Sequence, residues 1–242
     1  MISVIICTNR GDFLQNILSN FKKQSIKDKE LILIVNSSTV NLNNVQQDIE
    51  DHHINKYELL QFPDQISLGE CLNKGVHAAS FEYIGKMDDD DYYSPTYLKE
   101  TYETLVQTKA DVVGKGSFYI YFKRNHELRL YNPKHENLWI VNNGSNQYKS
   151  SYFLSGGTLT FKKDVIKRVP FPAVNIGEDS GFQQKCFEQG MKMYSSSKEN
   201  YAYIRHSQPK HHHSDVTEDL LKRRSVFTAI TRSPGGFFKE RQ

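Results

Sequence analysis

Apolar and polar stretches alternate along the first half of the chain with the spacing of strands and helices. Short apolar runs predict four strands, at residues 3–7, 31–35, 57–61 and 81–87. The segments between and after them carry helical spacing or caps, which predict helices at residues 11–23, 43–52, 67–79 and 94–107. Because strands alternate with helices, we expect right-handed βαβ units and a mainly parallel sheet.

The second half of the chain has a less regular pattern. It predicts strands at residues 117–122, 128–131 and 201–205, a turn and a strand within 153–161, and helices at 164–169, 176–189 and 215–230. The two neighbouring strands at 117–122 and 128–131 are expected to pair. No internal repeat or linker divides the chain, so we expect residues 1–242 to form a single domain.

Composition limits the classes of protein to which the chain can belong. The net charge of +3 is too small to indicate nucleic-acid binding. The mean hydropathy is -0.62, no apolar run approaches the length of a membrane span, and the N-terminus reads as a strand. Three widely spaced cysteines show neither a metal motif nor a disulfide framework, which favours a reducing compartment.

Four consecutive aspartates, Asp88, Asp89, Asp90 and Asp91, directly follow the fourth predicted strand. Adjacent carboxylates repel one another, so a cation is expected there, and hard oxygen ligands suit Mg²⁺ or Mn²⁺ bound with phosphates. Side chains alternate along an extended backbone, so either Asp88 with Asp90 or Asp89 with Asp91 can face the ion. The alternative is an acidic surface turn or a helix N-cap.

Other polar clusters also follow strands. Thr8, Asn9 and Arg10 follow the first strand, and Asn36 with Ser37 follows the second. Ligands of open parallel sheets bind at the carboxyl ends of the strands. We therefore expect these clusters and the aspartates to meet at one edge of the sheet.

Several motifs together resemble those of a known family. They are residues 2–10, Ser67-Leu68-Gly69, Asn73-Lys74-Gly75, residues 82–91, Gly156-Gly157, Phe161 and Gly177-Glu178-Asp179. Over residues 1–206 the chain resembles a family 2 glycosyltransferase of the GT-A fold. The resemblance implies an α/β architecture, with a Rossmann-like, mainly parallel sheet flanked by helices and a small mixed sheet on the acceptor side. It divides the chain into a nucleotide-sugar-binding half (1–110), an acceptor-side half (111–206) and a C-terminal helix or tail (207–242).

The resemblance also assigns residues to the donor. The metal, Mn²⁺ or Mg²⁺, would be held by Asp90 and Asp88, of which Asp88 could instead contact the ribose, while Asp91 would cap the next segment. The expected donor contacts are Thr8, Arg10, Asn36, Asp64, Asn73, Asp88, Asp89 and Arg205. Relatives usually carry Asp at the position of Asn36, which can still offer a carbonyl acceptor to uracil.

The acidic pair at the predicted start of the 176–189 helix provides a candidate for the catalytic base. The resemblance makes Asp179 the general base for the acceptor hydroxyl and gives Glu178 a role in orienting the acceptor. The alternative is the ordinary enrichment of acids at a helix N-terminus. No second, nucleophilic carboxylate is evident, which favours inversion of the sugar configuration.

Histidines and aromatic residues complete the expected site. We expect His206, and after it His211, to be a third metal ligand; the alternative is a structural hydrogen bond. The basic segment 210–224 is expected to be a lid over the diphosphate, or else a solvated helix face. Among the aromatic residues, Trp139 is the candidate for stacking on an acceptor sugar.

The chain is thus expected to be a metal-dependent inverting glycosyltransferase in polysaccharide biosynthesis. It would move a hexose or N-acetylhexosamine from a nucleotide-diphosphate donor, a UDP-sugar, to a saccharide or glycoconjugate acceptor, with no nucleic-acid partner. We expect it in the cytoplasm, at the inner face of the membrane as a peripheral protein. The alternatives are a nucleotidyltransferase, for which Thr8-Asn9-Arg10-Gly11 is too short a phosphate loop, and a non-catalytic nucleotide-sugar- or carbohydrate-binding protein.

Overall fold

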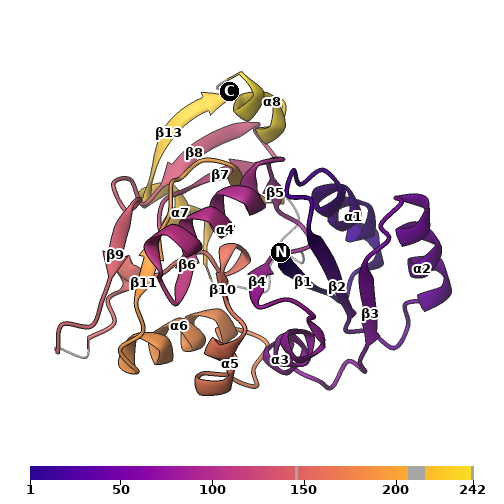
Figure 1. Ribbon diagram of the computed structural model, residues 1–242. Helices are drawn as coiled ribbons and strands as arrows, with labels where there is room; N and C mark the ends of the chain where they lie inside the picture. Colours follow the sequence, from indigo (N-terminus) through magenta and orange to yellow (C-terminus); the bar gives the residue numbers. More distant parts are fainter. Residues whose placement is uncertain (145–146, 207–215, 241–242) are drawn as a thin grey trace.

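A central sheet runs through the protein, whose computed structural model describes residues 1–144, 147–206 and 216–240 (Figure 1). Its eight strands within these residues follow the order β3 (Tyr57–Gln61), β2 (Lys29–Val35), β1 (Ile2–Thr8), β4 (Tyr83–Lys86), β10 (Thr160–Lys162), β6 (Val112–Gly114), β11 (Met193–Ser195) and β9 (Leu138–Ile140). Strands β1 to β4 pair in parallel, as predicted, whereas β10 and β9 run antiparallel to their neighbours.

Helices cover both faces of the central sheet. They are α1 (Leu14–Lys22), α2 (Leu42–Asp51), α3 (Leu68–Ala78), α4 (Tyr97–Thr108), α5 (Asp164–Arg168) and α6 (Glu178–Glu188), with single 3-10 turns η1 (Gly11–Phe13), η2 (Ser150–Tyr152) and η3 (Gly156–Thr158). Figure 1 shows α3, α5 and α6 gathered along one side. Within the described residues, no helix has both the length and the apolar character needed to cross a membrane.

The alternation of side chains along β1 explains the two layers of core. Val4 and Ile6 point into one cluster, which contains the buried faces of α1 and α2, whereas Ile5 points into another with α3, α5 and α6. Helix α3 begins at a capping box formed by Ser67 and Glu70. It approaches the sheet closely at Gly75, where a Cβ atom would lie 2.7 Å from the side chain of Ile34.

A second, mixed sheet packs against this core and confirms the predicted smaller sheet. Its strands follow the order β13 (Ser225–Ile230), β8 (Glu127–Tyr131), β7 (Phe118–Phe122), β12 (Tyr201–Arg205) and β5 (Tyr92–Tyr93). Ile120 and Tyr201 belong to the core shared with the central sheet, and Tyr119 and Leu128 lie in a separate cluster with Phe238 of α8 (Pro234–Lys239).

The predicted C-terminal helix at residues 215–230 is wrong over most of its length. Helix α7 covers only Glu218–Arg223, and Ser225–Ile230 forms β13, which pairs antiparallel with β8. Val226, Phe227 and Ile230 are more than half exposed. In an edge strand with exposed apolar residues, apolar and polar positions do not alternate regularly. The β-branched and aromatic composition of this segment was therefore the better indication of a strand. The division into donor half, acceptor half and tail stays a prediction.

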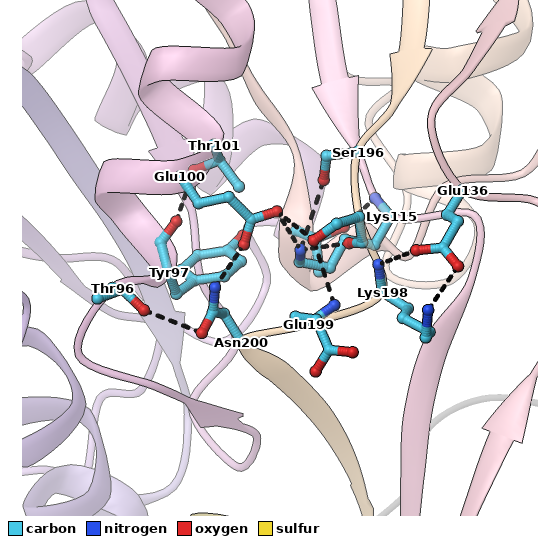
Figure 2. Close-up of polar contacts among 12 residues, drawn as sticks. Thr96, Tyr97, Glu100, Thr101, Lys115, Glu136, Ser196, Lys198, Glu199 and Asn200 are labelled. Atoms are coloured by element: carbon cyan, nitrogen blue, oxygen red, sulfur yellow. Dashed lines mark hydrogen bonds and ion pairs between the residues drawn. The ribbon is translucent and has the colours of Figure 1, made fainter. Parts of the chain in front are cut away.

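A buried lysine joins α4 to the second sheet. Lys115 lies just after β6 with its side chain fully buried, and its Nζ atom donates to Glu100 Oε1 of α4 at 3.0 Å and to the Ser197 carbonyl oxygen at 2.6 Å. Asn200 Nδ2 donates to Glu100 Oε2 at 2.7 Å, so the same carboxylate also holds the segment before β12 (Figure 2). The neighbouring pair of Lys198 and Glu136 continues this network.

Replacing Lys115 by Met is expected to lower the free energy of unfolding by about 3 kcal/mol, because removing one partner of a buried ion pair leaves the other uncompensated. Urea denaturation measures this loss. The control is Lys99→Met on α4, whose 3.8 Å pair with Glu103 is about half exposed on both sides and should contribute less than about 1 kcal/mol. Equal losses for the two variants would contradict the assigned role of Lys115.

Candidate active site

A cavity of about 1000 Å³ opens at the carboxyl ends of β1, β2 and β4. Helix α6 begins at its wall, and the C-terminal segment adds Val216, Leu220, Leu221 and Arg224. Nine of the residues predicted for the site line it: Thr8, Arg10, Asn36, Asp64, Asp88, Asp89, Asp90, Glu178 and Asp179. The strand-end clusters therefore meet at one edge of the sheet, as the sequence indicates.

Arg10 neutralises the middle of the aspartate run. Its guanidinium group forms ion pairs with Asp89 and, at 3.0 Å, with Asp90 Oδ2, while it stacks 4.2 Å from the ring centre of Phe13. Thr8 Oγ1 donates to Asp89 Oδ2 at 2.6 Å. Asp89 is thus the carboxylate through which the end of β1 is joined to the end of β4.

Asp91 points away from the cavity and supports the backbone. Its Oδ2 atom accepts from the Tyr201 hydroxyl at 2.5 Å and its Oδ1 atom from the Ile204 amide at 2.9 Å, both on β12. Asn20 of α1 donates to the Asp91 carbonyl oxygen at 2.8 Å. Burial raises the pKa of Asp91 well above its usual range. The residue therefore ties the aspartate run to the second sheet, which is a structural role.

Asp88 and Asp90 line the cavity with side chains that are more exposed than that of Asp89, although each also pairs with a cation, Lys86 or Arg10. The side chain of Asp88 is 39% exposed, and burial with the charges of Asp89 and Asp88 raises the pKa of Asp90 to about 7. Among the described residues that line the cavity, six carboxylates accompany three cations, namely Arg10, Lys86 and Arg224. This excess of negative charge fits an additional cation.

The donor set fits a divalent ion that is shared with a ligand. Within the described part of the chain, no three His, Cys, Asp or Glu side chains form a group that could hold a metal by themselves. Mg²⁺ and its relatives are commonly bound by one or two carboxylates together with substrate phosphates. Asp88 and Asp90 at the cavity wall suit that second arrangement.

The acidic pair lies in the first turn of α6, across from the aspartates. Gly177, with φ of 82°, precedes the helix, and burial raises the pKa of Asp179 and, to about 7, that of Glu178. A Cβ atom on Gly156 would collide with the Asp179 carboxylate, and one on Gly157 would lie 2.6 Å from Asp88 Oδ2. Asp88, just after β4, and Asp179 of α6 thus lie against two neighbouring glycines. A larger residue at either glycine would collide with one of these carboxylates, which explains why both positions are glycine.

Asn36 and Asp64 occupy another part of the cavity lining. Asn36 Nδ2 donates to the Pro63 carbonyl oxygen at 3.0 Å, and no described residue donates to its Oδ1 atom. Its Oδ1 atom is therefore available to accept a hydrogen bond. Asp64 Oδ2 accepts from the Ser38 amide at 3.2 Å.

Two predicted donor contacts lie outside the cavity lining. Asn73 makes reciprocal hydrogen bonds with the backbone of Phe171, at 2.8 and 2.9 Å, and so anchors the segment before α6. Arg205 donates to the Val216 carbonyl oxygen at 3.0 Å and so holds the C-terminal segment that borders the cavity. Both residues act on the shape of the site in this structure.

The structure places the predicted ligand His206 and the predicted acceptor residue Trp139 against aromatic side chains. His206 packs edge-on against Phe13, with ring centres 5.4 Å apart. His211 and the first part of the proposed lid, residues 210–215, lie outside the described residues, whereas Val216, Leu220, Leu221 and Arg224 of its second part line the cavity. Trp139 lies in β9 at the far edge of the central sheet, against Tyr194, and not on the cavity.

Sequence reasoning missed Lys86 as a site residue. It is the last residue of β4, its side chain is 6% exposed, and its Nζ atom lies 2.5 Å from Asp88 Oδ1. A lysine inside an otherwise apolar, buried strand was the available signal, because buried lysines normally require a partner.

Sequence comparison places the chain in a family. The sequence model of glycosyl transferase family 2 matches residues 3–169, and the chain belongs to this family. The glycosyltransferase GlyA of Streptococcus pneumoniae is 23% identical over 84% of the chain, which spans 30% of GlyA's length. The cholesterol galactosyltransferase of Borreliella burgdorferi is 32% identical over 50% of the chain and 33% of its own length.

Solved structures establish the GT-A fold. The S. aureus TarS 1-349 structure in complex with UDP-GlcNAc superposes with a TM-score of 0.66 at 17% identity, covering 90% of this chain and 63% of the TarS 1-349 chain. The mannosyltransferase PcManGT of Pyrobaculum calidifontis, in complex with GDP-Man and Mn²⁺, superposes with a TM-score of 0.63 at 15% identity. The match covers 86% of this chain and 57% of the PcManGT chain.

Replacing Asp91 by Asn should leave the fold nearly as stable as before, since an amide can accept from Ile204 and donate to Tyr201. Asp91→Leu removes the acceptor and should lower the free energy of unfolding by about 1–3 kcal/mol for each donor left unpaired. Chemical denaturation of both variants tests this. If Asn destabilised as much as Leu, the charge of Asp91 rather than its hydrogen bonds would be needed.

Proposed function

We propose that the protein is a metal-dependent, inverting glycosyltransferase that moves a sugar from a nucleotide-diphosphate donor to a hydroxyl group of a saccharide or glycoconjugate. The observation that carries this proposal is the meeting of Asp88 and Asp179 over Gly156 and Gly157 in a cavity of about 1000 Å³. A donor-side carboxylate and a candidate base thus border one space that is large enough for a nucleotide sugar.

Asp179 acts as the general base in this proposal. Burial raises its pKa above the usual range of an aspartate, which makes the carboxylate a stronger base. It takes the proton of the acceptor hydroxyl as the oxygen attacks the anomeric carbon, and the bond to the diphosphate breaks on the opposite face. A single displacement of this kind inverts the anomeric configuration.

Asp88 and Asp90 would hold the divalent cation, Mn²⁺ or Mg²⁺, which supplies Lewis-acid stabilisation of the leaving diphosphate. Arg10 adds a fixed positive charge beside Asp89 and Asp90. This guanidinium group both balances the aspartates and favours a diphosphate nearby.

The free carbonyl of Asn36 supports uridine as the donor nucleoside. In this proposal the Oδ1 atom of Asn36, a residue of the cavity lining, accepts from the imide N–H of uracil, as it could from guanine N1–H. Among the similar structures, one contains the uridine nucleotide sugar UDP-GlcNAc and another the guanosine nucleotide sugar GDP-Man. We further propose that the enzyme works in the cytoplasm, at the inner face of the membrane, in polysaccharide biosynthesis.

Replacing Asp179 by Asn should lower kcat by about 100- to 10,000-fold, the usual contribution of a positioned base. Binding of UDP with Mn²⁺, measured by calorimetry, should change little. The matched control is Glu188→Gln at the other end of α6, whose exposed side chain accepts a hydrogen bond from Gln184 and does not belong to the described cavity lining. An Asp179→Asn variant with wild-type turnover would rule out this residue as the base.

A screen of nucleotide sugars by thermal shift tests the donor and the metal together. UDP-sugars with Mn²⁺ should raise the melting temperature more than GDP-sugars do, because a bound ligand stabilises the folded state by mass action. Excess chelator should abolish both the shift and the turnover, and added Mn²⁺ should restore them. Undiminished turnover in chelator would refute the metal-dependent form of the proposal.

A further inference from the structure

Lys86 is a buried cation at the centre of the acidic cavity. It ends β4 with its side chain 6% exposed, and its ammonium group lies 2.5 Å from Asp88 Oδ1. Burial alone would lower its pKa, but Asp88, Glu178 and Asp179 together raise that pKa well above its usual value. The lysine thus pairs directly with Asp88 and lies within the electrostatic reach of the two acids that begin α6.

The two cations at this edge of the sheet serve different carboxylates. Arg10 pairs with Asp89 and Asp90, whereas Lys86 pairs with Asp88 and faces the acidic start of α6. Arg224, the remaining cation of the described cavity lining, is 3.5 Å from the Tyr131 hydroxyl on the second sheet. Lys86 is thus positioned between Asp88, which the proposed function assigns to the donor, and the acidic start of α6, which it assigns to the acceptor.

Gly156 and Gly157 bring the carboxylates of Asp179 and Asp88 to neighbouring positions beside Lys86. Asp179 lies against Gly156 and Asp88 against Gly157, so the two carboxylates are held at neighbouring positions of one chain segment. Tyr93 strengthens this arrangement, since its hydroxyl donates to the Gly157 carbonyl oxygen at 2.8 Å and accepts from the Asp88 amide at 2.7 Å. Without a cation nearby, two carboxylates placed in this way would repel one another.

We propose that Lys86 is a positioning residue for glycosyl transfer, which holds the carboxylates of Asp88 and Asp179 at a fixed spacing over the Gly156–Gly157 segment. The inference rests on the proposed function, because it assigns Lys86 to the reaction in which Asp179 is the base. Lys86 itself touches no reacting atom. Its loss lets the carboxylates move apart and misplaces the base relative to the donor.

Lys115 provides a matched control. It is likewise a buried lysine that is paired with a carboxylate, Glu100 at 3.0 Å, but it does not line the cavity. A purely structural lysine at position 86 would behave as Lys115 does, with lower stability and unchanged turnover of the folded enzyme.

The test compares Lys86→Met with Lys115→Met at a temperature where circular dichroism shows both to be folded. With the best donor from the screen, Lys86→Met should lower kcat by at least about 100-fold, the scale expected when a reacting group is misplaced by about 1 Å. Lys115→Met should stay within about threefold of the wild type. If Lys86→Met does not fold, Lys86→Gln replaces it, with the same expected loss.

A second readout separates positioning from stability. Glu178→Gln removes one charge that faces Lys86, so Lys86→Met should cost at least about tenfold less in kcat in that background than in the wild type. Wild-type turnover by the folded Lys86 variant, or the same fold-loss in both backgrounds, overturns the inference. Absence of transfer by the wild-type protein overturns the proposed function, and this inference with it.

Discussion

Repulsion between closely placed carboxylates is the constraint on which the site depends. Its cavity gathers six acidic side chains, and such a cluster is stable only if cations are distributed among them. Arg10 neutralises Asp89 and Asp90, and Lys86 neutralises Asp88 and the acidic turn of α6. Both cations come from the ends of adjacent parallel strands, so the sheet itself sets the distance between the two groups.

Hydrogen bonds from uncharged groups hold the last residue of the aspartate run, whereas the cations pair with the first three. Asp91 is bound by Tyr201 and Ile204 of the second sheet, and Asn20 of α1 holds its carbonyl oxygen. These contacts fix the path of the backbone through the aspartate run. Consecutive residues of one acidic motif thus serve different purposes, some facing a ligand and one joining the two sheets.

The first half of the fold could be predicted because its signals are local. Apolar runs and capping residues specified β1 to β4 and the helices between them. The rule that ligands lie at strand ends, together with the motif resemblance, specified nine cavity residues. The second half could not be predicted as well, because β6, β9 and β11 are three residues long and depend on neighbours distant in sequence. Strand β13 was mistaken for a helix for a similar reason, since its partner β8 lies about one hundred residues earlier.

The site residues show the same limit. Motif resemblance identified Asp90 and Asp179, but Asn73 and Arg205 turned out to support the cavity from outside. Lys86 was overlooked because its partners come from two elements, and only the tertiary structure brings Glu178 and Asp179 to the end of β4. A charged residue in a buried strand identifies a site only when the oppositely charged groups around it are known.

The wall contributed by Leu220 and Arg224 has a consequence for how the protein is made. Thr8 borders the same cavity from the opposite end of the chain, so the cavity is among the most non-local features of the molecule. During synthesis the aspartates and their cations leave the ribosome long before α7 does. Non-local contacts form late in folding. A nascent chain therefore acquires its acidic centre first and encloses it last.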